Sequence, residues 1–212
     1  MENKKENKIM KKTILAVTLA ATLLSGCSAI MGNETRSYDE LKADGQALLL
    51  KSNEEGYSAS GIQDLEKIRL GVNSAFLIAE PMYERYTENL LNTPELGNFM
   101  AATEAAESEE EKKAIYDALP QETKDKVDAY LNSSMTQEVM KGAAEVAKVI
   151  LKNSTAFLTV NTTSVLTQID FTDLMAEKAR IAHTADQLAY LDTTLVSAYK
   201  NYKVISAFSN AQ

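Results

Sequence analysis

The chain has 212 residues, of which 45% are hydrophobic and 25% are charged, with eight glycines, three prolines, one cysteine and one histidine. This is the composition of an ordinary globular protein, so long disordered segments, collagen-like repeats and a disulfide scaffold are excluded. One cysteine and one histidine also exclude zinc sites built from four cysteines, from Cys₂His₂ or from three histidines. The formal net charge of the whole chain is −8.

The N-terminal residues have the order of an export signal. Five lysines precede residue 13, and an uncharged run of 12 residues then extends from Thr13 to Leu24. A basic region followed by a short apolar stretch is typical of a secretory signal. The apolar run is too short for a permanent transmembrane helix, which needs about 20 residues.

The apolar run ends in the motif Leu24-Ser25-Gly26-Cys27. This motif resembles the lipobox of bacterial lipoproteins, which ends in small residues and an obligatory cysteine. The resemblance implies that signal peptidase II cleaves between Gly26 and Cys27, removing signal peptide 1–26. It also implies that Cys27 carries a covalent diacylglycerol and a further acyl chain such as palmitate on its new amino group. Because two or three acyl chains give lasting attachment, we expect a membrane-anchored protein.

The residue after the cysteine is serine. In this position the chain resembles lipoproteins of the enterobacterial type that are transported to the outer membrane, which carry a residue other than aspartate there. We therefore expect a cell-envelope protein, on the outer membrane and facing the periplasm if the cell is Gram-negative. Residues 27–36 show no sustained hydrophobic period and are interpreted as the lipidated cysteine and a tether. Residues 37–212 are expected to form a single α-helical domain, long enough to bury about 70% of its extended surface.

The mature chain is acidic, since removal of residues 1–26 leaves 17 Lys and Arg against 28 Asp and Glu, a net charge of −11. Acidic proteins repel phosphate backbones, so we expect no nucleic-acid partner. The same charge disfavours broad electrostatic contact with anionic lipid. The covalent lipid is therefore the expected contact with the membrane, and an unidentified envelope protein is the expected partner.

Two helices are predicted at the start of the domain, each opened by a capping box. Ser37 with Glu40, and Ser60 with Gln63, have the spacing at which two side chains satisfy each other's free backbone donors. Apolar stripes at helical spacing follow both starts: Tyr38, Leu41, Gly45, Leu48 and Leu49, then Ile62, Leu65, Ile68, Val72, Phe76 and Ala79. Pro81 should end or kink the second of these helices.

Short helices are predicted for the middle of the domain. Thr93-Pro94 is typical of a cap followed by a first-turn proline, and Pro120 separates two short helical runs. After Pro120 there is one glycine, Gly142, and no further proline, which favours long helices. One amphipathic stretch places Val139, Ala143, Val146 and Ile150 opposite Lys141, Glu145, Lys148 and Lys152.

The last segment repeats apolar residues every seven positions, at Leu174, Ile181, Leu188, Leu195 and Tyr202. A sustained seven-residue repeat predicts a long helix that wraps around a neighbour, which we expect to be helix 135–152. Segment 157–166 is rich in β-branched residues that would suit a strand. It is interpreted as helical because no second segment could pair with it. The predicted fold is an all-α bundle with short helices in the middle and a long, heptad-patterned C-terminal helix.

No catalytic constellation is evident. His183 projects nearly opposite Ile181 and Leu188 on its helix, so we expect it to be exposed and inert rather than part of a Ser-His-Asp device. A ferritin-like metal site is excluded because Arg180 stands where its Glu-x-x-His motif requires glutamate.

Five glutamates lie close together, at Glu104, Glu107, Glu109, Glu110 and Glu111. Ser108 followed by three glutamates is what the N-terminus of a helix prefers, so the group is interpreted as a solvated helix start and not as a Ca²⁺ site. No feature singles out one buried acid for glycan hydrolysis. We therefore assign no catalytic residue, no metal ligand and no cofactor other than the lipid on Cys27.

The C-terminal helix carries more apolar surface than one interface needs. Its main stripe runs through Leu191 and Leu195, whereas Tyr190, Val204 and Phe208 fall on another side. Such a helix either lies centrally in its own bundle or offers one side to a partner, so these three residues are a candidate interaction face. The leading hypothesis is a non-enzymatic interaction domain. The alternatives are a small-ligand or cation-binding lipoprotein and, third, a peptidoglycan-acting enzyme.

Overall fold

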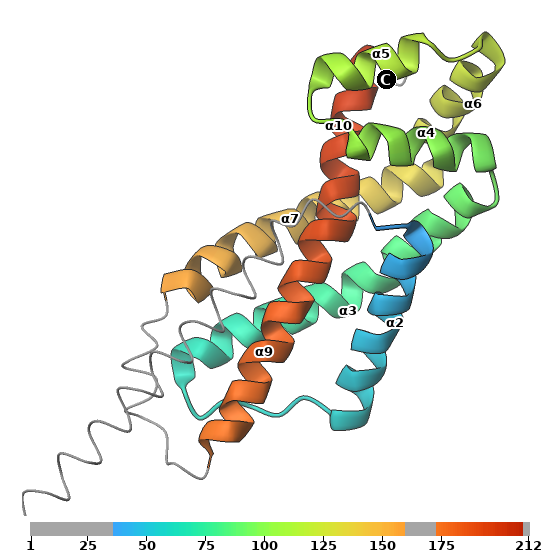
Figure 1. The fold of residues 1–212 in the computed structure, drawn as a ribbon. Coiled ribbons are helices and arrows are strands. Elements are labelled where there is room, and N and C mark those ends of the chain that lie inside the picture. Colours follow the sequence, from blue (N-terminus) through green and yellow to red (C-terminus); the bar gives the residue numbers. More distant parts are fainter. Residues whose placement is uncertain (1–35, 160–172, 210–212) are drawn as a thin grey trace, which may run out of the picture.

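The computed structural model describes residues 36–159 and 173–209, and within these ranges it contains helices and connections without a strand. The predicted all-α bundle is therefore confirmed (Figure 1). The signal peptide, Cys27 and the tether up to residue 35 lie outside the described residues. Segment 157–166 is helical up to residue 159, and its remainder also lies outside them.

Helix α2 (Tyr38–Glu55) begins with the predicted capping box. The Ser37 hydroxyl accepts a hydrogen bond from the Glu40 amide (3.3 Å), and the Glu40 carboxylate accepts one from the Ser37 amide (2.8 Å). Helix α3 (Gln63–Leu91) begins without a side-chain cap, so the predicted box of Ser60 with Gln63 is wrong. The reason is tertiary, because the Ser60 hydroxyl donates to a carboxylate of a distant helix, Glu177 Oε2 (2.9 Å).

Pro81 lies inside α3 and does not end it. Proline cannot donate to the carbonyl four residues earlier, that of Leu77. Both residues are exposed, so water can satisfy this carbonyl. Packing stabilises the helix across Pro81, because α3 buries one continuous face before and after the proline. This face is formed by Val72, Phe76, Ala79, Tyr83, Tyr86 and Leu90.

Three short helices follow, as predicted: α4 (Pro94–Ala105), α5 (Glu109–Asp117) and α6 (Gln121–Leu131). Pro94 stands in the first turn of α4, and Pro120 immediately precedes α6. The Ser108 hydroxyl caps α5 by accepting from the Glu111 amide (3.1 Å). These helices lie together at one end of the molecule, where α4 and α5 pack against α10 (Figure 1).

The next helix is α7 (Ser134–Thr159). The C-terminal helix is continuous and consists of three segments: α9 (Leu174–Leu191), η1 (Asp192–Val196) and α10 (Ser197–Phe208). The middle piece η1 is a π-helical turn. Two threonine hydroxyls donate to carbonyls of the preceding turn here, Thr193 to Ala189 (2.9 Å) and Thr194 to Tyr190 (2.5 Å). Such back-bonding bends or loosens the regular helical ladder.

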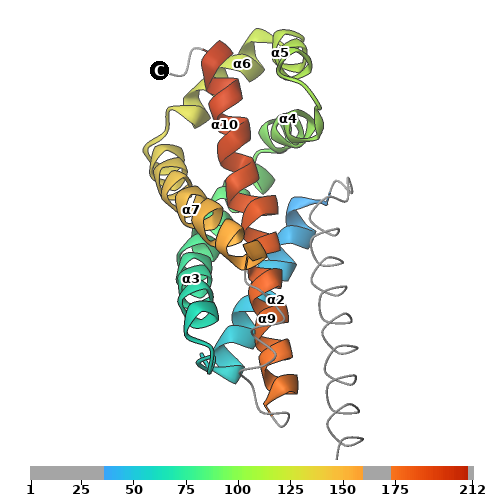
Figure 2. The same cartoon turned by 90° about the vertical axis from the view of Figure 1, so that its left-hand side faces the viewer.

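Helix α3 is the central packing partner of the bundle. It runs along α7 and also packs against α9 and α2, while η1 crosses α7 (Figure 2). The C-terminal helix therefore contacts α7 as predicted, but its α9 half lies on α3 and α2. Where α7 lies against α3, the end of the Met82 side chain packs on Gly142, at the place that a Cβ would occupy.

The predicted apolar positions of α7 are buried, at Val139, Ala143, Val146 and Ile150. Of the predicted heptad positions, Ile181, Leu188 and Leu195 are buried, whereas Leu174 and Tyr202 are half-buried. The opposite face of α7 is exposed. Within the described ranges, no helix combines the length and hydropathy needed to span a bilayer.

Candidate functional site: a groove between α2 and the C-terminal helix

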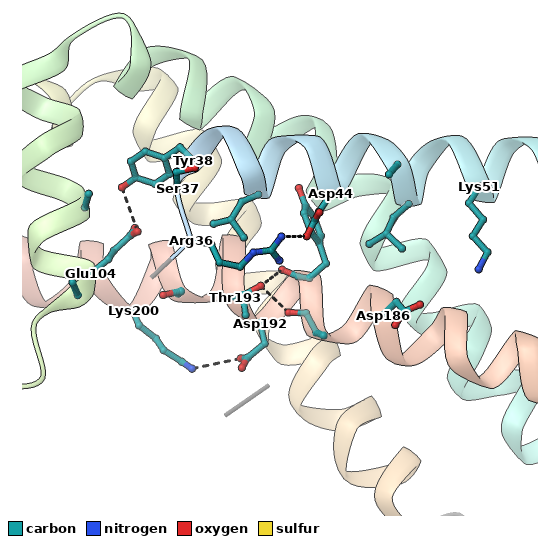
Figure 3. Close-up of a pocket in the computed structure, with 18 of the residues that line it drawn as sticks. Arg36, Ser37, Tyr38, Asp44, Lys51, Glu104, Asp186, Asp192, Thr193 and Lys200 are labelled. Carbon is teal, nitrogen blue, oxygen red and sulfur yellow. Dashed lines mark hydrogen bonds and ion pairs between the residues drawn. The ribbon is translucent and has the colours of Figure 1, made fainter. Parts of the chain in front are cut away.

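An open groove of about 1360 Å³ runs between α2 and the C-terminal helix, with α4 at one end (Figure 3). The π-turn forms part of its wall through Asp192 and Thr193. Several of its walls are made of small side chains, at Ala47, Ala101, Ala105, Ala189 and Ser197. Small residues leave space above the helix backbones, so a second chain could approach closely here.

The groove carries more acidic than basic side chains. It is lined by the acids Asp44, Glu104, Glu107, Asp186 and Asp192 and by the bases Arg36, Lys51 and Lys200. Two of the bases are engaged within the groove, since Arg36 pairs with Asp44 and Lys200 lies 3.6 Å from Asp192. The remaining charge favours a partner surface that is neutral or basic.

A tyrosine–glutamate pair closes one end of the groove. The Tyr38 hydroxyl donates to Glu104 Oε2 (3.3 Å), joining the start of α2 to α4 (Figure 3). Burial raises the pKa of the Glu104 carboxyl to about 7, although the hydrogen bond from Tyr38 and the nearby Lys112 charge both act to lower it. The interpretation of Glu104 as part of a solvated helix start is therefore wrong. The other four glutamates of that group are exposed, as expected.

Behind this pair lies a buried polar network. Asn201 is 1% exposed, accepts from Lys112 Nζ (2.8 Å) and donates to the Thr103 hydroxyl (3.0 Å). Burial lowers the pKa of Lys112, and the neighbouring carboxylates Glu104 and Glu109 oppose this effect. Every member of this network has a partner, so it joins α4, α5 and α10 at the end of the groove.

The residues of the candidate interaction face do not form one exposed surface. Tyr190 is 5% exposed, and its ring packs edge-on against Phe76 (5.6 Å between centroids) and Tyr83 (6.2 Å). Phe208 is half-buried against Tyr116 (5.5 Å), and Val204 is half-buried.

The candidate face is corrected accordingly. The C-terminal helix is apolar on two sides because it is sandwiched between α3, α2, α7 and the short helices of its own domain. Gly45 makes room for Tyr190, since a Cβ on this glycine would overlap the tyrosine hydroxyl.

His183 is not the exposed residue that its position relative to Ile181 predicted. It is half-buried, and its Nε2 lies 3.0 Å from the Ser52 hydroxyl of α2. The signal was present in the sequence, because His183, Gln187 and Tyr190 have the spacing of a single helix face. That face packs on α2 and α3. No group of three or more potential metal ligands occurs within the described ranges.

Replacing Glu104 with glutamine should stabilise the protein at pH 8 by about 1–3 kcal/mol. The carboxyl ionises near pH 4.5 when unfolded and near pH 7 when folded, so its ionisation lowers the free energy of unfolding as the pH rises between these values. Glutamine stays neutral and can still accept from Tyr38.

The measurement is urea unfolding of wild type and variant at pH 5 and pH 8, with Glu107→Gln, on the same groove but exposed, as the control. Equal stability of wild type and Glu104→Gln at pH 8 would contradict the burial of this charge.

The chain matches no protein-family model, no curated protein sequence and no solved structure. Fold and groove geometry thus come from this chain alone.

Proposed function

We propose that the protein is a lipoprotein of the cell envelope, anchored through Cys27, whose helical domain binds a segment of a partner protein in the groove without catalysing a reaction. The lipobox supports the anchor, and the groove supports the binding role. The groove is the observation that carries the proposal for the domain; of the three residues of the predicted face, Tyr190 lines it, whereas Val204 and Phe208 do not.

The size of the groove favours a peptide or helix over a small molecule. Pockets for small ligands usually measure about 300–1,000 Å³ and enclose most of the ligand. This groove is larger, at about 1360 Å³, and open along its length. An amphipathic helix laid into a groove is a recurring mode of recognition. The acidic lining suits a partner segment whose apolar face is flanked by basic residues.

The position of the groove relative to the tether restricts where the partner can be. Arg36 lines the groove and follows Cys27 by nine residues. Nine residues span at most about 30 Å when fully extended. The entrance at Arg36 is therefore held close to the membrane surface, and the expected partner is a membrane protein or another membrane-anchored protein of the envelope.

One observation favours the enzymatic alternative. Glu104 offers a carboxyl whose pKa is raised to about 7 in a groove, which is a property of general acids in glycan hydrolysis. Such hydrolysis also needs a second carboxylate placed across the scissile bond. Release of soluble fragments from purified peptidoglycan by wild type, and its loss in Glu104→Gln, would support this alternative over the binding role.

The binding role is tested by filling the groove. A photo-crosslinking amino acid at Ser197, on the groove wall, should give an adduct with one envelope protein in living cells. Ala101→Trp should abolish this adduct, because Ala101 lines the groove and is exposed, so the indole occupies the groove without disturbing the core.

The matched control is Ala102→Trp, an exposed position next along α4 that does not line the groove. This variant should keep the adduct, and both variants should keep the melting temperature of wild type. An adduct that survives Ala101→Trp, or no adduct at all, would show that the groove is not the binding surface.

A further inference from the structure

A second cavity, of about 170 Å³, lies at the C-terminal end of α2. It is enclosed by the last turn of α2, the loop that follows it, α3 and α9. Its charge differs from that of the groove: Arg69 and His183 line it, and no aspartate or glutamate does so among the described residues. In a mature chain with a net charge of −11, a cavity lined without acids favours a negatively charged occupant.

Arg69 is the charged group of this cavity, and its side chain is 6% exposed. One terminal nitrogen donates to the Ser58 carbonyl (3.0 Å) and to Glu66 Oε2 (3.3 Å). The buried Nε has no hydrogen-bond partner. A buried charged donor without an acceptor is costly, so the hydrogen-bonding capacity of this guanidinium is only partly satisfied within the chain.

The charge of Arg69 is only partly balanced by Glu66. The same carboxylate also accepts from the Tyr57 hydroxyl (2.8 Å) and from the Ser60 amide (2.6 Å). Because several donors share this carboxylate, it offsets only part of the positive charge of the guanidinium. The Tyr57 ring lies 5.4 Å from this guanidinium and adds apolar shielding from solvent.

A second donor stands one turn further along α3. Asn73 accepts from Gln187 Nε2 through its Oδ1 (2.9 Å), which leaves the amide nitrogen of Asn73 as a donor. Gln187 also donates to the Ser52 hydroxyl (3.3 Å). Arg69 and Asn73 are four residues apart on one helix, so both side chains project from the same face.

The Ser52–His183 pair in the cavity does not have the geometry of an activated nucleophile. The Ser52 hydroxyl donates its proton to the Leu48 carbonyl of its own helix (2.9 Å). With its proton in this bond the hydroxyl does not donate to His183 Nε2, which lies 3.0 Å away, and its oxygen accepts from Gln187 Nε2. The chemistry of the cavity is that of binding.

We propose that this cavity binds a small oxyanion, a carboxylate or phosphate group, through the Arg69 guanidinium and the Asn73 amide. Its volume is below that of pockets for drug-sized ligands and suits a free ion or the terminal group of a larger molecule. An oxyanion here would be attracted by the charge of the Arg69 guanidinium, whose partner Glu66 is shared with other donors.

The test is titration calorimetry on the mature lipoprotein in non-ionic detergent at constant ionic strength, with inorganic phosphate in one arm and acetate in the other. Saturable binding of either ion is expected, and the arm with the tighter binding identifies which oxyanion the cavity takes. Asn73→Asp should weaken this binding at least tenfold, because it replaces a donor with a negative charge while keeping the acceptor for Gln187.

Asn89→Asp is the matched control, since it makes the same change at an exposed position of α3 outside the cavity, and it should leave the affinity unchanged. Arg69→Gln should also abolish binding, with the melting temperature measured alongside because Arg69 anchors the Ser58 loop. The absence of saturable binding in both arms, or equal binding by wild type and Asn73→Asp, would overturn the proposal. Neither outcome depends on the groove.

Discussion

Replacing Cys27 with serine should abolish both the lipid and the cleavage of the signal peptide. The thiol is the atom that would accept the diacylglycerol, and in the lipoprotein pathway cleavage follows this step. The variant should run as a larger precursor on a gel and take up no labelled palmitate. Without acyl chains it should also lose the lasting attachment that two or three chains provide.

Ser28→Ala is the appropriate control for this experiment. It changes the neighbouring residue without touching the acceptor thiol, so both processing and labelling should continue. If Cys27→Ser matures to the wild-type size and incorporates palmitate, the chain is not a lipoprotein of the proposed kind.

Tyr190→Ala should lower the free energy of unfolding by about 3–5 kcal/mol, as truncations of buried aromatic residues do. Tyr190 is 5% exposed and packs on Phe76 and Tyr83, so its loss leaves a cavity between α2, α3 and α9. Gly45 cannot fill this space because it has no side chain. Denaturant unfolding of the mature protein measures the effect.

Met175→Ala provides a comparison on the same continuous helix. Met175 is 72% exposed, so its truncation should stay within about 0.5 kcal/mol of wild type. A loss at Tyr190 no larger than this would mean that the tyrosine is not part of the core and would return it to consideration as an interaction residue.

The two sites are linked to one element, α2. Its first turn and middle line the groove, and its last turn lines the oxyanion cavity. The π-turn of the opposite helix helps to shape the groove, and π-turns occur frequently at functional sites. The back-bonded Thr193 and Thr194 lie in this turn, but only its position opposite α2 makes it part of a site.

Most of the helices could be predicted from the sequence because local interactions determine them. The Ser37–Glu40 capping box, the first-turn proline Pro94 and the cap at Ser108 involve residues within three positions of one another. The apolar stripes of α7 and of the C-terminal helix likewise express a helical period that needs no knowledge of the partner. The anchor is a prediction of the same kind, since the lipobox is a short local motif.

The errors share one physical cause, which is packing between elements distant in the sequence. Pro81 does not end α3, one of the two outcomes predicted for it, because α3 is buried on both sides of the proline. The Ser60 hydroxyl donates to Glu177, more than a hundred residues away, and does not cap α3. Glu104 differs from its exposed neighbours because α2 brings Tyr38 against it.

The sequence by itself determined the helical class, several helix starts and the candidate lipidation site, because each depends on neighbouring residues in one chain segment. Only the tertiary structure decided which side of each helix is covered. It buried Tyr190 in the core, enclosed His183 beside Ser52 and left the groove and the Arg69 cavity open. A helical period identifies an apolar face, but the number of neighbours around a helix depends on how all the helices assemble.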